Sequence, residues 1–214
     1  MARIMVNELA AQVGINVVAG KPATWSPGDL DAVDLICHTL SAQRPGDDDG
    51  KYILDGVAPG WLGVAVVHGL HPQAVCLNDP RLGAVEIPKL SPFGQGSDHL
   101  TWKVTETRDF NLVQFEIPGG TLDVSVLPDI VPPLVRGDKG VLLNGRGPNW
   151  LLAALAMGYH VTRWVATFQP ATPPQVQPPA PAQYITCMTH VANVKLGTTI
   201  LDTDVQADLA AATS

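Results

Sequence analysis

The sequence predicts an α/β fold made of two tandem copies of a small mixed-sheet β-turn-α-β domain, packed together as a pseudo-dimer. The first observation is an internal repeat, in which identical residues recur 89 positions later along the chain. The second is that each copy has the order of an apolar strand, a Gly/Pro turn, an apolar helix and another strand. The recurring residues are Gly56, Pro59, Trp61, Leu62 and His71 in the first copy, and Gly145, Pro148, Trp150, Leu151 and His160 in the second.

The first copy is expected to cover residues 14–98, beginning with a strand at residues 15–18. Residues 30–40 are apolar at helical spacing and carry aspartates near their start, where the helix dipole favours negative charge. They therefore predict an amphipathic helix. Asp47, Asp48 and Asp49 follow, and a solvated loop explains them better than a cation site because no paired ligand pattern accompanies them.

The repeated core gives the same four elements in each copy. In the first copy we expect a strand at residues 52–54, a turn at 55–59, a helix at 61–70 and a strand at 74–77. In the second copy, at residues 99–204, the counterparts are residues 141–143, 144–148, 150–159 and 163–168. A proline at the start of each helix is favourable because its missing N–H would have no intrahelical partner. Pro72 ends the first helix.

The remaining segments complete the second copy. Residues 91–98 are rich in Gly, Ser and Pro and end the first copy, and residues 102–106 and 112–117 alternate as a hairpin would. Three prolines within residues 124–135 exclude one regular helix there. Residues 170–181 are proline-rich and predict an extended surface loop, residues 184–188 a strand, and the tail after residue 204 a frayed helix.

Composition bounds the classes of function. The chain has 214 residues, 46% of them hydrophobic, which is typical of a globular protein. Its net charge of −7 argues against a generic nucleic-acid surface but leaves room for a small phosphorylated ligand at one positive site. Cys37, Cys76 and Cys187 suggest neither a disulfide framework nor a zinc site. Without a membrane span or a signal peptide in the sequence, we expect a cytoplasmic protein with no membrane partner.

The turn Asn144-Gly145-Arg146-Gly147-Pro148 is the best candidate for ligand binding. It leads from a strand to a helix N-terminus, where backbone N–H groups favour an anion, and Arg146 adds a charge that can grip phosphate. Asp55 and Gly56 occupy the corresponding turn of the first copy. The segment is neither a P-loop nor a dinucleotide fingerprint, and a tight turn with a solvated arginine explains it about as well.

Histidines form the second group of candidates. His68 and His71 are three residues apart and share one helix face, as metal ligands or as a base and its orienting partner would. A pair at the edge of the core is the simpler explanation, but His71 recurs in the repeat as His160. His190 follows a strand and is expected to line the same edge, whereas His38 and His99 look incidental.

Asp79-Pro80-Arg81 is the third candidate. It follows the strand at residues 74–77, so its charged groups would lie at the carboxyl end of a strand, where open α/β sheets bind ligands. Asp79 is suited to a divalent cation and Arg81 to stabilising charge on a phosphate. The alternative is an ion pair within a turn, which is common.

These motifs together resemble the CRISPR-associated Csx-three family, the ring nucleases of type III CRISPR systems. The family unit reads GRGPxWL, a helix ending in Tyr-His or a similar pair, a strand, and then DPRLGAV. The second copy carries the first part of this unit as residues 145–151 followed by Tyr159 and His160. The first copy carries the second part as residues 79–85.

The resemblance implies antiviral hydrolase activity on cyclic oligoadenylate, expected to be cyclic tetra-adenylate, with manganese as the divalent metal. It also implies RNA-like partners such as short RNA, and head-to-tail homo-oligomers that hold the ligand between subunits. Carried over by position, the catalytic residues are His71, Asp79, Arg81 and His160, with Asp79 and His71 as metal ligands and Arg146 in the phosphate grip.

Each copy departs from the family pattern where the other keeps it. The first copy has Val57 and Ala58 in place of the GRGP arginine and glycine, and the second has Gln169 and Ala171 in place of the DPRLG aspartate and arginine. We therefore expect one composite site, with the phosphate grip from the second copy and the metal and charge-stabilising groups from the first. The rival interpretations are a decayed sensor or assembly subunit that only binds the ligand, and an exonuclease acting on linear RNA tails.

Overall fold

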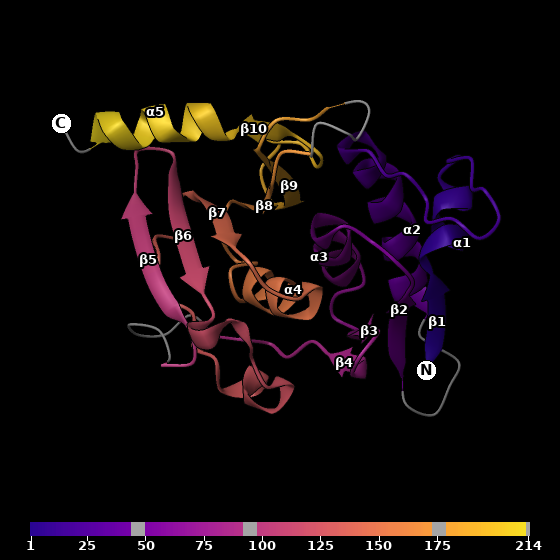
Figure 1. Cartoon of the computed structure of the whole chain (residues 1–214). Helices are drawn as coiled ribbons and strands as arrows, with labels where there is room; N and C mark the ends of the chain where they lie inside the picture. Colours follow the sequence, from indigo (N-terminus) through magenta and orange to yellow (C-terminus); the bar gives the residue numbers. More distant parts are fainter. Residues whose placement is uncertain (44–49, 92–97, 173–178, 213–214) are drawn as a thin grey trace.

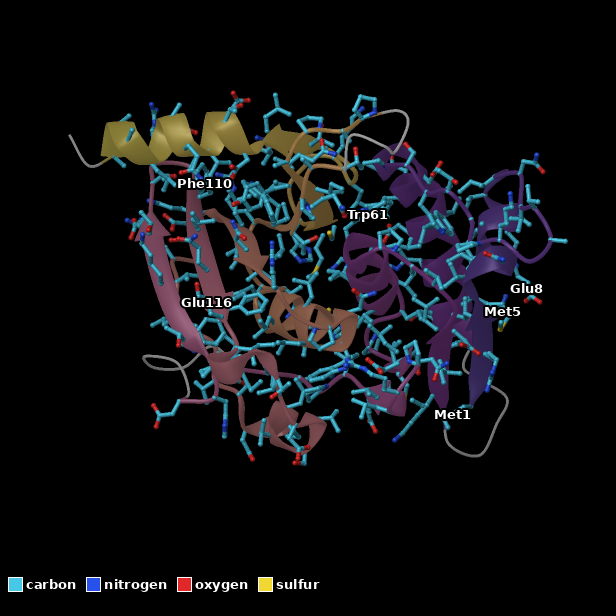
Figure 2. All side chains as sticks on the ribbon, viewed as in Figure 1. Met1, Met5, Glu8, Trp61, Phe110 and Glu116 are labelled. Atoms are coloured by element: carbon cyan, nitrogen blue, oxygen red, sulfur yellow. The ribbon has the colours of Figure 1, made fainter. Side chains whose placement is uncertain are left out.

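The computed structural model describes residues 1–43, 50–91, 98–172 and 179–212. Two β-sheets stand at opposite sides of the molecule, and helices α3 (Gly60–Gly69) and α4 (Asn149–Gly158) lie side by side between them (Figure 1). Side chains fill the space between the sheets (Figure 2). Within the described residues, no helix has the length and apolar character needed to cross a membrane. The α/β class predicted from the sequence is confirmed.

The first sheet has four strands in the order β1-β2-β3-β4, of which the first three are parallel and β4 is antiparallel. Helix α3 lies between the two sheets, and the helix at residues 30–43 packs against it (Figure 1). The strands are β1 (Ala2–Met5), β2 (Lys51–Asp55), β3 (Ala74–Asp79) and β4 (Gly83–Glu86), and the helices are α1 (Val6–Gln12), α2 (Leu30–Gln43) and α3 (Gly60–Gly69).

The second sheet has six strands in the order β10-β9-β8-β7-β6-β5. Here β6, β7 and β8 are parallel, and the remaining pairs are antiparallel. The strands are β5 (Thr101–Glu106), β6 (Phe110–Glu116), β7 (Gly140–Gly145), β8 (Trp164–Gln169), β9 (Gln183–Thr189) and β10 (Thr199–Leu201), and the helices are α4 (Asn149–Gly158) and α5 (Asp202–Ala212).

The two sheets share one pattern of strand pairing. Strands β1-β2-β3-β4 and β6-β7-β8-β9 both run parallel, parallel, antiparallel along the row. Tyr52 pairs with Val75 in the first sheet, and its repeat counterpart Val141 pairs with Val165 in the second. The spacing is therefore 89 from β2 and β7 up to His71 and His160 but 90 in β3 and β8, which makes Gln169 the counterpart of Asp79.

Helices α3 and α4 make the central contact of the molecule. Nearly every residue of both helices is buried, as expected of helices that are apolar all round. Their N-termini meet where Gly60 lies against Asn149, its repeat counterpart, and their C-terminal ends meet where His71 lies against His160. The two helices thus run side by side in the same direction, and equivalent residues of the repeat face each other.

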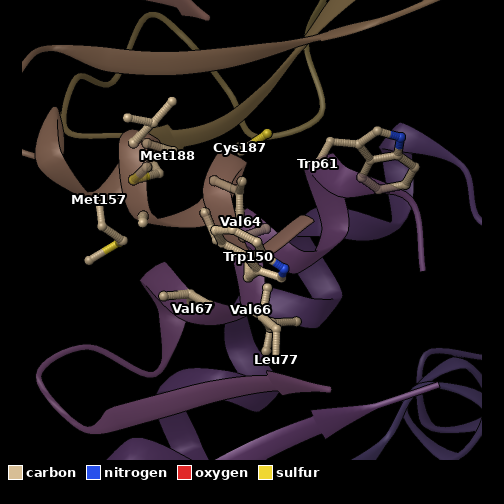
Figure 3. Packing of buried hydrophobic residues seen from close by; sticks show 14 of the residues in the cluster. Trp61, Val64, Val66, Val67, Leu77, Trp150, Met157, Cys187 and Met188 are labelled. Carbon is tan, nitrogen blue, oxygen red and sulfur yellow. The ribbon is translucent and has the colours of Figure 1, made fainter. Parts of the chain in front are cut away.

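Trp150 shows how closely the two halves interlock. It belongs to α4, yet it points toward Val66 of α3 and Leu77 of β3 in the first half (Figure 3). The ring is 2% exposed. Burying a side chain of this size contributes several kcal/mol, so the indole is a main anchor between the halves.

Most elements expected from the sequence are present, including the helix at residues 30–40, both repeated cores, the hairpin of β5 and β6, and the strand at residues 184–188. No regular helix spans residues 124–135, as predicted. The tail forms α5, which packs Val205 and Leu209 on the outer face of the second sheet. The predicted turn at Asp47–Asp49 lies outside the described residues, as does the middle of the loop at residues 170–181.

The strand expected at residues 15–18 is wrong. This segment has no regular structure, and two glycines with positive φ, Gly14 and Gly20, flank it. The first sheet instead takes its edge strand from β1, whose Ala2 and Ile4 pack on the core and which precedes the expected boundary at residue 14. The tandem-copy interpretation and its limits, 14–98 and 99–204, stay predictions.

Gly140→Ala is expected to destabilise the fold by about 2–3 kcal/mol, because a Cβ at Gly140 would lie 2.0 Å from the Trp164 ring. Urea unfolding measures this free energy. The matched control is Gly137→Ala, where a Cβ meets nothing within 4 Å. Equal stability of the two variants would contradict the tight packing of β7 against Trp164.

Candidate functional site

The candidate residues lie at two opposite edges of the sheets. Asp79 and Gly145 end parallel strands, so they lie at the carboxyl edge, whereas His71 and His160 follow the central helices and precede β3 and β8. A six-residue strand such as β8 spans about 20 Å. The expected catalytic set is therefore divided within one chain, and Asp79 and His71 are too far apart to hold the same metal ion.

A cleft of about 820 Å³ opens at the carboxyl edge of the second sheet. Arg81 of the first half lines it together with the ligand-binding candidates of the second half, and Arg81 and Pro148 also line a neighbouring cleft of about 580 Å³. The larger cleft is lined by Arg81, Gln114, Phe115, Glu116, Ile117, Gly120, Asn144, Gly145, Arg146, Gly147, Pro148 and Phe168.

The turn of the larger cleft can receive an anion. It connects β7 to α4, whose N-terminus has no side-chain cap, and Arg146 is exposed beside it. The glycines also have a packing reason, because a Cβ at Gly145 would lie 2.5 Å from the Phe115 carbonyl oxygen. Their presence alone is therefore no sign of a ligand, and the anion site depends on Arg146, the uncapped helix and Arg81.

The corresponding turn of the first half is used differently. The Asp55 carboxylate accepts a hydrogen bond from Arg3 at 2.6 Å and one from Asn78 at 2.7 Å. Gly56 has a φ of 123° and lies against Val6. Both candidates line the smaller cleft, but the Asp55 carboxylate is committed to neighbouring strands of its own sheet.

Asp79 holds the turn that carries Arg81. Its Oδ1 accepts hydrogen bonds from the backbone N–H groups of Arg81, at 2.8 Å, and Leu82, at 3.3 Å. These bonds, with the nearby guanidinium and the Trp150 indole, lower the pKa of the Asp79 carboxyl. Arg81 Nε lies 3.6 Å from Oδ1, while 80% of the Arg81 side chain is exposed. The turn ion pair considered from the sequence is thus present, and Asp79 aims Arg81 at both clefts.

Four histidines gather at the opposite edge. The His71 and His160 rings are 5.3 Å apart between centroids, and the His68 and His190 rings are 5.4 Å apart. His190 Nε2 hydrogen-bonds to the His160 carbonyl oxygen, and His160 Nδ1 lies 3.2 Å from the Met157 carbonyl oxygen. Because a carbonyl can only accept, these bonds place a proton on Nε2 of His190 and one on Nδ1 of His160.

The surroundings of this histidine cluster keep two of its imidazoles neutral. Burial, reinforced by the neighbouring histidines, lowers the pKa of His68 to about 4. Burial, with His160 and Lys89 nearby, also lowers the pKa of His71. His68 Nδ1 is buried and has no hydrogen-bond partner. Of the two incidental histidines, His38 pairs with Asp34 at 3.3 Å and His99 is exposed.

The sequence-based candidates are therefore brought together in two groups. Arg81 joins Asn144, Gly145, Arg146 and Gly147 at the carboxyl edge, and His190 joins the other histidines at the opposite edge. Among the described residues, no group of three or more His, Cys, Asp or Glu side chains is placed to hold a metal ion. The three cysteines are free and buried.

Sequence reasoning missed Gln114, Phe168 and Trp150 as neighbours of these groups. Phe168 ends one predicted strand and Gln114 lies in the second half of β6, so a place near the same edge could have been inferred for both. The approach of Trp150 to Asp79 was not, because it depends on how the two halves pack.

Residues 116–201 match the family model described as CRISPR-associated protein (Cas_csx3). The match includes β7, α4, β8 and β9, and so covers Arg146 and His160. It confirms the family resemblance inferred from the motifs. Asp79 and Arg81 lie outside the matched residues, and the roles assigned to them stay predictions.

Acid is expected to destabilise the protein through His68. The folded state keeps this imidazole neutral down to about pH 4, while the unfolded chain takes up a proton near pH 6.5. Stability is therefore complete above pH 6.5 and falls by about 2 kcal/mol as the pH drops through this window. Urea unfolding at pH 7 and pH 4.5 measures the loss.

His68→Met should remove this part of the acid sensitivity, since Met157 occupies the equivalent position of α4. His99→Met, at an exposed histidine outside the cluster, is the control and should keep it. An unchanged pH dependence in the first variant would show that His68 is not the responsible group.

Proposed function

We propose that this chain is a ring nuclease of the CRISPR-associated family whose model its residues 116–201 match, and that it binds cyclic oligoadenylate and cleaves one of its phosphodiester bonds. The observation that carries the proposal is the meeting of Arg81 from the first half with Arg146 and its turn from the second in one cleft. Neither half holds both cations. A ligand with several phosphates placed along this edge would contact both halves.

Because the candidate residues lie at two opposite edges of one chain, a complete site requires two copies of the chain. If the ligand is gripped at the carboxyl edge, the histidines that act on it come from another copy of the chain. We therefore propose head-to-tail stacking, in which the histidine edge of one copy closes on the carboxyl edge of the next. Large exposed apolar side chains on both edges support it, with Val57 69% and Val161 71% exposed.

His71 and His160 supply proton transfer in this scheme. The lowered pKa of His71 keeps that imidazole neutral at pH 7, so it can accept a proton from an attacking hydroxyl group. The His160 ring is held by the contact of Nδ1 with the Met157 carbonyl oxygen, so Nε2 is the ring nitrogen left to exchange a proton with the ligand. Arg81 and Arg146 stabilise the negative charge on the phosphate.

The manganese ion expected from the family resemblance does not fit one chain alone. Asp79 uses Oδ1 for two backbone N–H groups, and the described residues contain no ready set of three ligands. The proposed cleavage therefore relies on the histidines and arginines alone. It is to be assayed both with manganese and with a chelator.

The two backbone hydrogen bonds accepted by Asp79 favour a second candidate function. If Asp79 only stabilises its turn, the chain binds cyclic oligoadenylate without cleaving it and acts as a sensor or an assembly subunit. Binding without linear products would identify this function. Cleavage of linear RNA in preference to the ring would instead identify an exonuclease.

Incubation of the purified chain with cyclic tetra-adenylate is expected to yield linear products, resolved by chromatography. Arg81→Ala should weaken binding by roughly tenfold, because a charge-assisted hydrogen bond to phosphate contributes about 1.5–3 kcal/mol. Lys103→Ala removes an exposed charge of strand β5 outside the cleft lining and should bind as the wild type does. Absence of binding by the wild type would refute the proposed function.

Val161→Glu should reduce both stacking and cleavage, because a carboxylate replaces an exposed apolar side chain beside His160 and would meet the facing copy. Sedimentation velocity with and without cyclic tetra-adenylate measures the stacking. Leu35→Glu changes an exposed apolar residue on α2 and is the control. Normal cleavage by a strictly monomeric Val161→Glu protein would contradict the composite site.

A further inference from the structure

We propose that Asn144 reads the exocyclic amino group of a nucleobase in the larger cleft, and that Phe168 is the ring on which this base stacks. The inference rests on the proposed function and deepens it, since it assigns a residue that selects the base. The chemical class it predicts is an amino-bearing base such as adenine, in preference to its oxo counterpart hypoxanthine.

The geometry begins with a row of side chains across the second sheet. Gln114 pairs with Asn144 in the register of β6 and β7, and Leu143 pairs with Thr167 in β7 and β8, which places Asn144 beside Phe168. Phe168 in turn pairs with Tyr184. Neighbouring residues in register point to the same face, so amide, amide, phenyl and phenol groups stand side by side at the carboxyl edge.

A hydrogen bond and a nearby charge favour one orientation of the Asn144 amide. Its Nδ2 donates to the Tyr184 hydroxyl oxygen at 2.8 Å. The carboxylate of Asp202, the first residue of α5, is close enough to help raise the pKa of Tyr184, and its negative charge favours a hydroxyl that turns its proton toward Asp202 and accepts from Asn144. Tyr184 is fully buried, and burial raises its pKa to about 12, so it stays protonated.

This orientation leaves the carbonyl oxygen of Asn144 as its free group. A carbonyl oxygen accepts hydrogen bonds and cannot donate one. It therefore matches the amino group of adenine and opposes the carbonyl oxygen that hypoxanthine carries at the same position. An unmatched acceptor pair in a partly buried site lowers affinity by roughly tenfold or more.

Phe168 is suited to the stacking role because it is half-buried and its position is fixed. Its ring lies 5.2 Å from that of Tyr184, between centroids, and it lines the cleft together with Arg81 and Arg146. Stacking on an aromatic ring is a general means of holding a base. The two arginines are placed to take the phosphate of the same nucleotide.

The first half has no such row. Asp55 takes the place of Asn144, and its carboxylate is bound by Arg3 and Asn78. Asn78 stands where the second half has Phe168, by the 90-residue spacing of these strands. Each chain therefore offers one base-reading position, in the larger cleft.

The test is isothermal titration of the full chain with cyclic tetra-adenylate and with its all-inosine counterpart, cyclic tetra-inosinate. The wild type is expected to bind the adenine ring at least tenfold more tightly. Asn144→Leu, which keeps the size of the side chain but has no acceptor, should bind both rings with equal affinity. Tyr184→Phe, which frees the amide to rotate, should reduce the preference severalfold. Asn78→Ala, in the first half, should keep the full preference.

Equal affinity of the wild type for both rings would overturn the inference, as would an undiminished preference in Asn144→Leu. In either case tight binding of cyclic tetra-adenylate would leave the proposed function standing. A wild type that binds neither ring would refute both. Far-ultraviolet circular dichroism and urea unfolding of each variant show that the fold is kept, and Tyr184→Phe tests the hydrogen bond to Nδ2 without altering Asn144.

Discussion

The packing of α3 against α4 is the contact on which the rest of the structure depends. Both helices are apolar on all sides, so neither can be exposed, and each is buried only when two sheets enclose the pair. This requirement joins the two halves into one core, with Trp150 of one half set against Leu77 of the other. The same contact brings Arg81 into the cleft of the second half and His71 against His160.

The polar chemistry of the two halves has diverged around this common core. In the second half, Asn144 and Arg146 keep polar groups free at the cleft, whereas in the first half Asp55 is bound within its own sheet by Arg3 and Asn78. The first half contributes Asp79 and Arg81 instead, and there the aspartate shapes the turn that presents the arginine. The polar groups that remain available at the clefts thus lie at different positions in the two halves.

The sequence predicted the elements well where the hydrophobic pattern was long and its ends were marked, as in residues 30–40 and both repeated cores. It missed β1 because a four-residue edge strand containing Arg3 leaves little pattern to detect. It also grouped Asp79 with His71, although the length of strand β3 separates them within one chain. Motif positions along a chain do not specify on which side of a sheet they emerge, because only the packing of whole elements decides it.

The single extra residue between α4 and β8 fixes how the halves correspond. Equivalent positions are 89 apart up to His160 and 90 apart in the strands that follow. A designer who wished to restore two equal halves would therefore place the aspartate and arginine at Gln169 and Ala171, and not one residue earlier. At the earlier position the graft would put the carboxylate on Phe168 and turn it to the opposite face of the sheet, since neighbouring residues of a strand point to opposite sides. The one extra residue thus decides which positions of the two halves correspond, and any substitution carried from one half to the other has to follow it.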